Sequence, residues 1–365
     1  MKMKNKFYIG RYVKKTKGFS IIEFMVASLL SMIILIAVGA GYFAARKVND
    51  VAIARLNAQQ DIRNVSNMVV HDARMAGGFG CFNINSLDQA RNITVVTDEE
   101  SKTDIRRLVG FQFSDTVELS EGVKSIDKNR FSAATGINNF TAQSDAVVFQ
   151  YGEGSPAVTE VGTNTITINA ASDVATNHLA NNSFVAISTC NTLGRYSIIS
   201  KNQNVLTLDQ ALHNSIISPA VRHEVSLAKY VVNIYVVGTP TGRERGFYRI
   251  RLGVDGKWET PQLLLSGIDR MDILYGYVHK CQGIDPEIDT DVVAASAPET
   301  FSFTDKPEAT RSNRPLASIR LVLNRNNIAA EGQLMSNAAS REIAGNVHIY
   351  NIDANIRGGN RCADR

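Results

Sequence analysis

Three kinds of residue are missing from the start of this chain. No proline occurs before Pro156, no acidic residue occurs before Glu23, and no charged residue lies in the 22 positions 24–45. Proline interrupts a helix because its ring removes a backbone donor and clashes with the preceding turn, so its absence permits one long helix. A charge-free run of about 20 residues is long enough to cross a bilayer as a helix. The N-terminal part therefore predicts a membrane-spanning helix.

Recognisable catalytic motifs are also missing. The six histidines form no H-E-x-x-H pattern, and the chain has no G-x-S-x-G turn and no phosphate-binding loop. One match to G-x-G-x-x-A, at residues 39–44, lies inside the apolar run and follows no strand, so it does not predict a dinucleotide site. The sequence thus predicts a protein that is not an enzyme and that holds no cofactor.

Cysteine is scarce, and its spacing argues against a zinc site. The four cysteines are Cys81, Cys190, Cys281 and Cys362, all after the apolar run, and no two form a C-x-x-C pair. An even number in a domain outside the cytoplasm predicts two disulfides. Of the three possible pairings we favour Cys81 with Cys190 and Cys281 with Cys362, which keeps each link within one half of the domain. The alternative is that one or both pairs stay buried as free thiols.

Positive charge is concentrated in front of the apolar run. Its carriers are Lys2, Lys4, Lys6, Arg11, Lys14, Lys15 and Lys17. A basic flank keeps that end of a membrane helix in the cytoplasm, so the rest of the chain is expected on the far side. The formal net charge of the whole chain is +4. Without these seven residues, the chain has 32 basic and 35 acidic residues, which is a net charge of −3. The basic excess is a topology signal, and it does not predict a nucleic-acid partner.

Glu23 is a carboxylate in apolar surroundings. Such a group is costly at bilayer depth and needs a partner. A cut between Gly18 and Phe19 would give Phe19 a free amino group about one helical turn from Glu23, on the same chain or on a neighbouring one. The run Gly18-Phe19-Ser20-Ile21-Ile22-Glu23, behind a basic leader, resembles the class III signal of type IV pilins and type II secretion pseudopilins. The alternative is a plain membrane anchor with a chance glutamate.

That resemblance implies a processing route. A prepilin peptidase would remove the leader peptide, residues 1–18, by cutting after Gly18, and would methylate the new N-terminal Phe19. Glu23 would then guide the subunit into a growing filament. Residues 19–45 would form the transmembrane helix and later the filament core. The protein would thus pass the inner membrane once and carry its head in the periplasm.

A helical pattern continues beyond the membrane segment. Apolar residues recur at three- and four-residue steps between Val48 and Val69, and Gly77-Gly78 provide a stop signal. We expect one helix over residues 19–75, with residues 46–80 as the amphipathic half of a stem and residues 81–365 as a β-rich head. The expected fold class is α+β, a long helical stem with a mostly β head of the pilin type.

Short apolar runs separated by Gly, Asn, Asp and Pro predict strands in the head. We expect them at residues 146–151, 165–168, 183–188, 196–200, 205–208, 226–237, 246–252, 268–277, 318–323 and 347–352. Residues 253–256 predict a turn, and the polar residues 88–139 predict loops with short elements.

Several segments resemble the PilW group of minor pilins. Residues 72–81 match the pattern D-x-R-x-A-G-x-x-G-C that closes the stem in that group. Residues 144–151 resemble its early head strand, residues 232–251 its central hairpin, and residues 263–276 the helix-to-strand piece that follows.

The PilW resemblance implies a minor pilin in a tip complex. Its partners would be other minor pilins, the major pilin, a large tip adhesin and the inner-membrane assembly platform. It would prime assembly and support adhesion, twitching motility or DNA uptake, and would end in the pilus at the cell surface. The alternative is a J-type minor pseudopilin of type II secretion. The 285 residues after position 80 favour the pilus, because they are many for a pseudopilin head.

Two charged clusters in the head have both a functional and an ordinary interpretation. The acidic loop contains Asp285, Glu287, Asp289 and Asp291. These carboxylates could hold calcium, but their spacing does not match an EF-hand, so a solvated loop is the default. The arginine row contains Arg243, Arg245, Arg249 and Arg251. It could contact phosphates, although such rows more often protect a sheet edge from aggregation.

Overall fold

The structure is a computed structural model, which divides the chain into two compact units, Met1–Asn57 and Ala58–Arg365. The residues that it describes are 18, 20–80, 82–83, 94–96, 116–120, 122–154, 156–169, 179–189, 192–217, 224–253, 256–278, 301–305, 316–326, 340–343 and 347–356.

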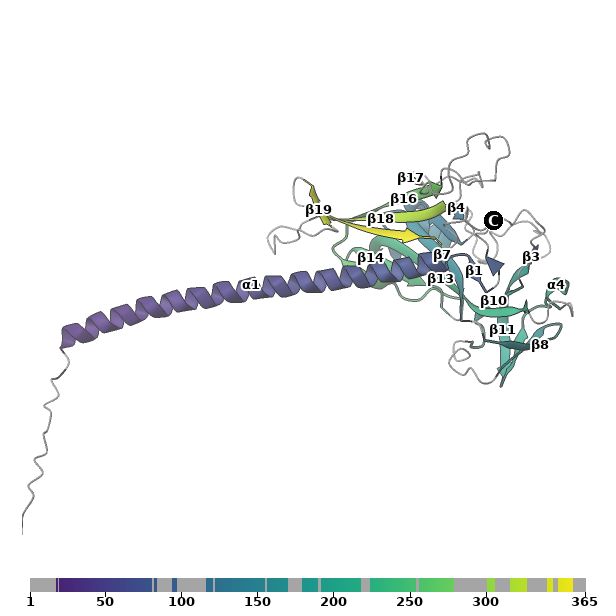
Figure 1. Ribbon diagram of the computed structural model, residues 1–365, viewed down its shortest axis with the longest axis horizontal. Helices are drawn as coiled ribbons and strands as arrows, with labels where there is room; N and C mark the ends of the chain where they lie inside the picture. Colours follow the sequence, from purple (N-terminus) through teal and green to yellow (C-terminus); the bar gives the residue numbers. More distant parts are fainter. Residues whose placement is uncertain are drawn as a thin grey trace, which may run out of the picture. The chain divides into compact units, whose positions relative to one another are not determined.

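The N-terminal element is one helix, α1 (Ile21–Met75), which Figure 1 shows as an unbroken coil. It continues through Gly39 and Gly41 without interruption. Among the described residues, α1 is the one helix long and apolar enough to span a membrane. It ends before Gly77, whose φ of 78° is a left-handed conformation that stops a helix. The expected helix over residues 19–75 is therefore confirmed within two residues at its start.

The second unit is mostly β and contains two main sheets (Figure 1). The larger sheet runs in the order β4-β5-β7-β13-β10-β11-β12-β9-β8. Its strands are β4 (Thr116–Ser120), β5 (Val123–Ile126), β7 (Ala146–Glu153), β8 (Val158–Val161), β9 (Thr165–Ile168), β10 (Phe184–Ser188), β11 (Thr192–Asn202), β12 (Val205–Leu208) and β13 (Ser226–Pro240). The long strand β13 also pairs with β6 (Phe140–Ala142) and β14 (Gly246–Arg251), β14 pairs with β15 (Gln262–Ser266), and β3 (Thr94–Val96) pairs with β11.

The smaller sheet has the order β17-β16-β18-β20-β19. Its strands are β16 (Arg270–Val278), β17 (Phe301–Thr304), β18 (Leu316–Asn326), β19 (Ser340–Ile343) and β20 (Val347–Asn355). A two-stranded ladder, β1 (Gly78–Phe79) with β2 (Phe82–Asn83), follows α1 directly. The short helical elements are a 3-10 turn (Lys128–Arg130), α2 (Phe131–Thr135) and α4 (Asn214–Ile217).

The main core joins the end of α1 to both sheets. From α1 it takes Val65, Val69, Ala73 and Ala76; from the larger sheet Phe149, Tyr235 and Phe247; from the smaller sheet Ile273, Leu321 and Ile352. One polar contact also joins the sheets, because Tyr275 Oη donates to Ser125 Oγ at 2.9 Å. The last part of α1 is thus an internal element of the second unit, and its buried face is the row of residues spaced by three and four that the sequence shows.

The α+β class is confirmed, and each expected strand from 146–151 to 347–352 overlaps an observed one. The residues that flank the expected turn are paired: Gly253 N–H donates to Lys257 O at 2.7 Å, and Leu252 bridges to Trp258. Residues 254 and 255 lie outside the described part of the chain.

One expectation drawn from resemblance is wrong. Residues 263–276 do not begin as a helix, because Gln262–Ser266 is strand β15. The reason is that both faces of this strand are covered. A bulge between Leu263 and Leu265 turns them to opposite faces, so that Leu265 belongs to the main core and Leu263 packs against the core on the other face of the sheet. A short run of leucines is compatible with a helix or with such a strand.

Gly122 tests the close packing at the end of α1. A β-carbon built on Gly122 would overlap the backbone of Gly77. We expect Gly122→Ala to lower the free energy of unfolding by about 1–3 kcal/mol, as overpacking of a tight site does. The measurement is denaturant unfolding of the full chain in detergent micelles, followed by Trp258 fluorescence. The control is Gly41→Ala, at a helical glycine with no atom within 4 Å of a built β-carbon, where alanine favours the helix and no loss is expected. A loss no larger than in the control would contradict the packing argument.

Candidate functional site

The start of α1 presents Glu23 in a capping arrangement. Ser20 N–H donates to Glu23 Oε2 at 3.1 Å, and Phe24 N–H donates to Ser20 O at 3.1 Å. Ser20 thus precedes the first helical turn and Glu23 supplies the returning carboxylate, as in a capping box. Gly18 is exposed, with no atom within 4 Å of a β-carbon built on it. Phe19, the expected methylated residue, lies outside the described residues.

The first part of α1 exposes an apolar surface. Large side chains from Ile21 to Phe43 are each more than half exposed, including Phe24 at 70% and Leu35 at 71%. Exposed apolar side chains continue past the charge-free run at Val48, Ile53 and Leu56. So much apolar surface needs either lipid or other apolar helices around it. The single carboxylate of Glu23 lies near the start of this surface.

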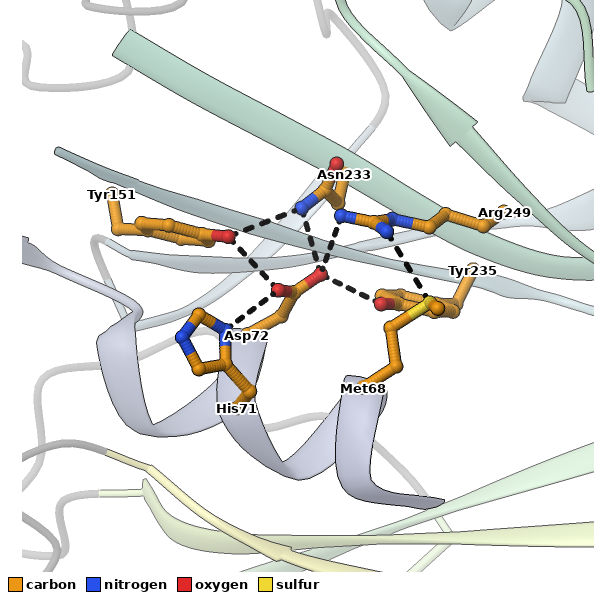
Figure 2. A network of polar contacts seen from close by, with 7 residues as sticks. All are labelled: Met68, His71, Asp72, Tyr151, Asn233, Tyr235 and Arg249. Carbon is orange, nitrogen blue, oxygen red and sulfur yellow. Dashed lines mark hydrogen bonds and ion pairs between the residues drawn. The ribbon is translucent and has the colours of Figure 1, made fainter. Parts of the chain in front are cut away.

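The other end of α1 carries a second carboxylate, Asp72, which is buried with 2% of its surface exposed. Figure 2 shows the donors from the larger sheet that surround it. Tyr151 Oη donates to Oδ1 at 2.9 Å, Tyr235 Oη donates to Oδ2 at 2.6 Å, and Asn233 Nδ2 donates to Oδ2 at 2.7 Å. Together with Arg249, these residues form what we call the Asp72 cluster.

Positive charge reaches the Asp72 cluster from Arg249 on β14. Its Nη2 lies 3.5 Å from Asp72 Oδ2, and its Nη1 donates to the sulfur of Met68 at 3.2 Å. The side chain of Arg249 is 11% exposed, so both charges are largely removed from water. His71 approaches Asp72 Oδ1 at 3.3 Å, but its ring is 63% exposed. Because burial of a lone carboxylate is very costly, the donors and the guanidinium are what allow Asp72 to be buried.

Local sequence places each member of the Asp72 cluster. Asp72 follows Val69 by three residues and Val65 by seven, so it falls on the buried face of α1. Asn233 and Tyr235 alternate on β13 and therefore share a face, and Arg249 lies opposite Tyr235 in the β13–β14 pairing. That shared face of the larger sheet is the face that contacts α1.

Burial raises the pKa of Tyr151 and of Tyr235 well above the usual value of about 10. The negative charge of Asp72 raises both pKa values further, because an ionised phenol beside a carboxylate would be repelled. The positive charge of Arg249 acts in the opposite direction on both. Both phenols therefore remain protonated donors through the neutral range.

The cluster is not fully satisfied. Asn233 Oδ1 and Arg249 Nε are buried and have no hydrogen-bond partner. If Asp72 were removed, the donors of Tyr151, Tyr235 and Asn233 would lose their acceptor and Arg249 would lose its anion. These groups would then be unsatisfied in addition to the two atoms above. Loss of the carboxylate should thus cost more than the net value of the hydrogen bonds it accepts.

The arginine row of the sequence is not a sheet edge, so that default interpretation is wrong. Strand β14 pairs with β13 on one side and with β15 on the other. Arg249 contacts Asp72, Arg245 Nη1 lies 3.3 Å from Asp269 Oδ1, and Arg243 Nη1 donates to Pro261 O at 3.4 Å. Three of the four arginines thus make side-chain contacts within the chain, and Arg249 does so from a strand that has a neighbour on each side.

The remaining predicted site residues fall outside the described part of the chain. They are the four cysteines, Cys81, Cys190, Cys281 and Cys362, and the acidic loop residues Asp285, Glu287, Asp289 and Asp291. Their disulfides and the calcium site stay predictions. The sequence did not predict the Asp72 cluster, because Asp72 stands out there only as the first residue of the D-x-R-x-A-G-x-x-G-C pattern. The available signal was an aspartate in phase with the buried valines.

Tyr235→Phe tests the strength of the contact with a buried charge. Because hydrogen bonds to charged groups contribute about 1.5–3 kcal/mol, we expect that loss in the free energy of unfolding. The control is Tyr275→Phe, which removes a bond to the neutral Ser125 hydroxyl and should cost about 1 kcal/mol. Denaturant unfolding of the full chain in micelles measures both, and equal losses would contradict an ionised Asp72.

Alkaline pH provides a second test. Above about pH 10 the tyrosines of the unfolded chain ionise, whereas Tyr235 stays protonated in the fold because its pKa is raised. The unfolded state then binds fewer protons, so stability falls as pH rises, by up to about 1.4 kcal/mol per pH unit for each such tyrosine. In Tyr235→Phe the slope between pH 10 and about 12 should be shallower by about that amount. An unchanged slope would mean that Tyr235 ionises alike in both states.

No family model, curated protein or solved structure matches this chain in comparisons with known proteins. The features on which a function can be based are therefore those of the chain itself. They are an exposed apolar helix whose first turn carries a glutamate that caps Ser20 N–H, and a buried carboxylate that joins the other end of that helix to a β sheet.

Proposed function

We propose that this protein is a minor pilin. After removal of residues 1–18 it would enter type IV pili and help to prime their assembly in a tip complex. The observation that carries the proposal is the run Gly18-Phe19-Ser20-Ile21-Ile22-Glu23 at the start of an exposed, charge-free helix. Other minor pilins and the major pilin are the proposed neighbours, and the prepilin peptidase and the assembly platform are the proposed machinery.

The physical mechanism is compensation of charge in apolar surroundings. Cleavage after Gly18 creates an ammonium group at Phe19, and a carboxylate in a low-dielectric setting attracts such a group strongly. Within the described part of the chain, Glu23 accepts one hydrogen bond, from Ser20 N–H. A carboxylate has about four acceptor positions, so Glu23 retains capacity for the amino terminus of a subunit already in the filament.

Two substitutions at Glu23 separate its charge from its capping role. Glu23→Gln removes the charge but leaves a side chain that can still cap Ser20 N–H, whereas Glu23→Ala removes both. In cells that assemble the filament, we expect both variants to insert in the membrane. Both should fall in the sheared filament fraction by on the order of tenfold, the factor that about 1.4 kcal/mol represents.

The matched control for Glu23 is Asp50→Ala, an exposed acidic residue on the same helix. It should reach the filament fraction at the wild-type level. Wild-type incorporation of Glu23→Gln would contradict docking by charge. Recovery of the chain with secretion pseudopilins instead of pilus subunits would replace the pilus by the type II secretion alternative.

A further inference from the structure

The apolar contacts of α1 define its position on the sheet poorly. Its buried residues Val65, Val69, Ala73 and Ala76 follow one another at three- and four-residue steps. A shift of the helix along its axis by one turn, about 5.4 Å, would place Val65 where Val69 lies and Val69 where Ala73 lies. Aliphatic side chains would then still meet the aliphatic and aromatic surface of the sheets. These contacts hold the helix on the sheet but discriminate little between neighbouring registers.

Asp72 breaks that repeat. Four residues before it lies Met68, and four residues after it lies Ala76, which is fully buried. After that shift of one turn, Met68 would face the hydroxyl groups of Tyr151 and Tyr235, and Asp72 would occupy the apolar site of Ala76. After a shift in the opposite direction, Ala76 would face these hydroxyl groups and Asp72 would occupy the place of Met68. In either case buried donors lose their acceptor or a buried carboxylate loses its donors, and both are costly.

We propose that the Asp72 cluster sets the register of α1 on the larger sheet. Buried polar groups often contribute more to the choice of one arrangement than to total stability, as a single buried polar residue does in coiled coils. The register determines which residues of α1 pack against the larger sheet. This assignment rests on the geometry of the cluster and holds whether or not the chain is a pilin.

A second contact acts at the end of α1 and must be separated from the first. Gly77 N–H donates to Gln150 O at 2.8 Å, which ties the residue after the helix to β7. If this tie alone fixed the register, substitution of Asp72 would weaken the protein without moving the helix. A measurement of position, and not only of stability, is therefore required.

Photocrosslinking measures the register directly. A groove of about 270 Å³ is lined by Leu264 of β15 and by Ala58, Asp61 and Ile62 of α1. A benzophenone amino acid in place of Leu264, in the full chain in detergent micelles, should label these three helix residues. In Asp72→Leu we expect further adducts four residues away, at residues 54 and 57 or at residues 65 and 66. Their share should be on the order of half, as for two states of similar free energy.

The control is Asn67→Leu, which makes the same kind of change at an exposed position of α1. It should keep the labelling of Ala58, Asp61 and Ile62. If Asp72→Leu does not fold, as judged by Trp258 fluorescence, the double variant Tyr151→Phe with Tyr235→Phe replaces it, because it removes two donors and keeps the ring volumes. Adducts confined to the original three residues in whichever of the two variants folds would overturn the proposal.

Discussion

A carboxylate in apolar surroundings must find hydrogen-bond donors or a cation, and this requirement governs both ends of α1. At the buried end, Asp72 receives donors from Tyr151, Tyr235 and Asn233 and a cation from Arg249. At the exposed end, Glu23 receives Ser20 N–H among the described residues. The hydrogen-bond partners of Asp72 thus come from within the same chain. Glu23 retains acceptor capacity on a surface that needs lipid or protein partners.

The two sheets surround the buried end of α1 with paired strands and close packing. Strand β13 supplies two of the donors and also pairs with β7, β10 and β14, so its side chains are held by neighbours on both sides. The smaller sheet packs into the same core as α1. Because interiors are close-packed, these contacts keep the end of α1 on the sheet, and we propose that the Asp72 cluster selects its register. The hydrogen bonds of Asp72 and the apolar packing of the main core therefore both hold the end of α1.

Much of the fold followed from pattern. The helix was predictable because no proline or charge interrupts it, and strands such as 165–168 and 205–208 alternate clearly between polar and apolar residues. Strand β15 was not predictable in this way, because both of its faces are covered and its sequence therefore does not alternate between polar and apolar residues. The partners of Asp72 could not be found from sequence either, because they are up to 177 residues apart from it and meet only through the sheet registry. Gly18 and Glu23 stand out in the sequence because their pattern is local, and their roles stay predictions.

We propose that the chain becomes a filament subunit by exchanging its leader for a charged amino terminus. The most direct measurement is the intact mass of the protein extracted from membranes of cells that contain a prepilin peptidase. The account predicts the mass of residues 19–365 with one added methyl group. A protein that retains Met1 and the full leader would have no amino terminus at Phe19 for Glu23 to meet, and it would contradict the claim.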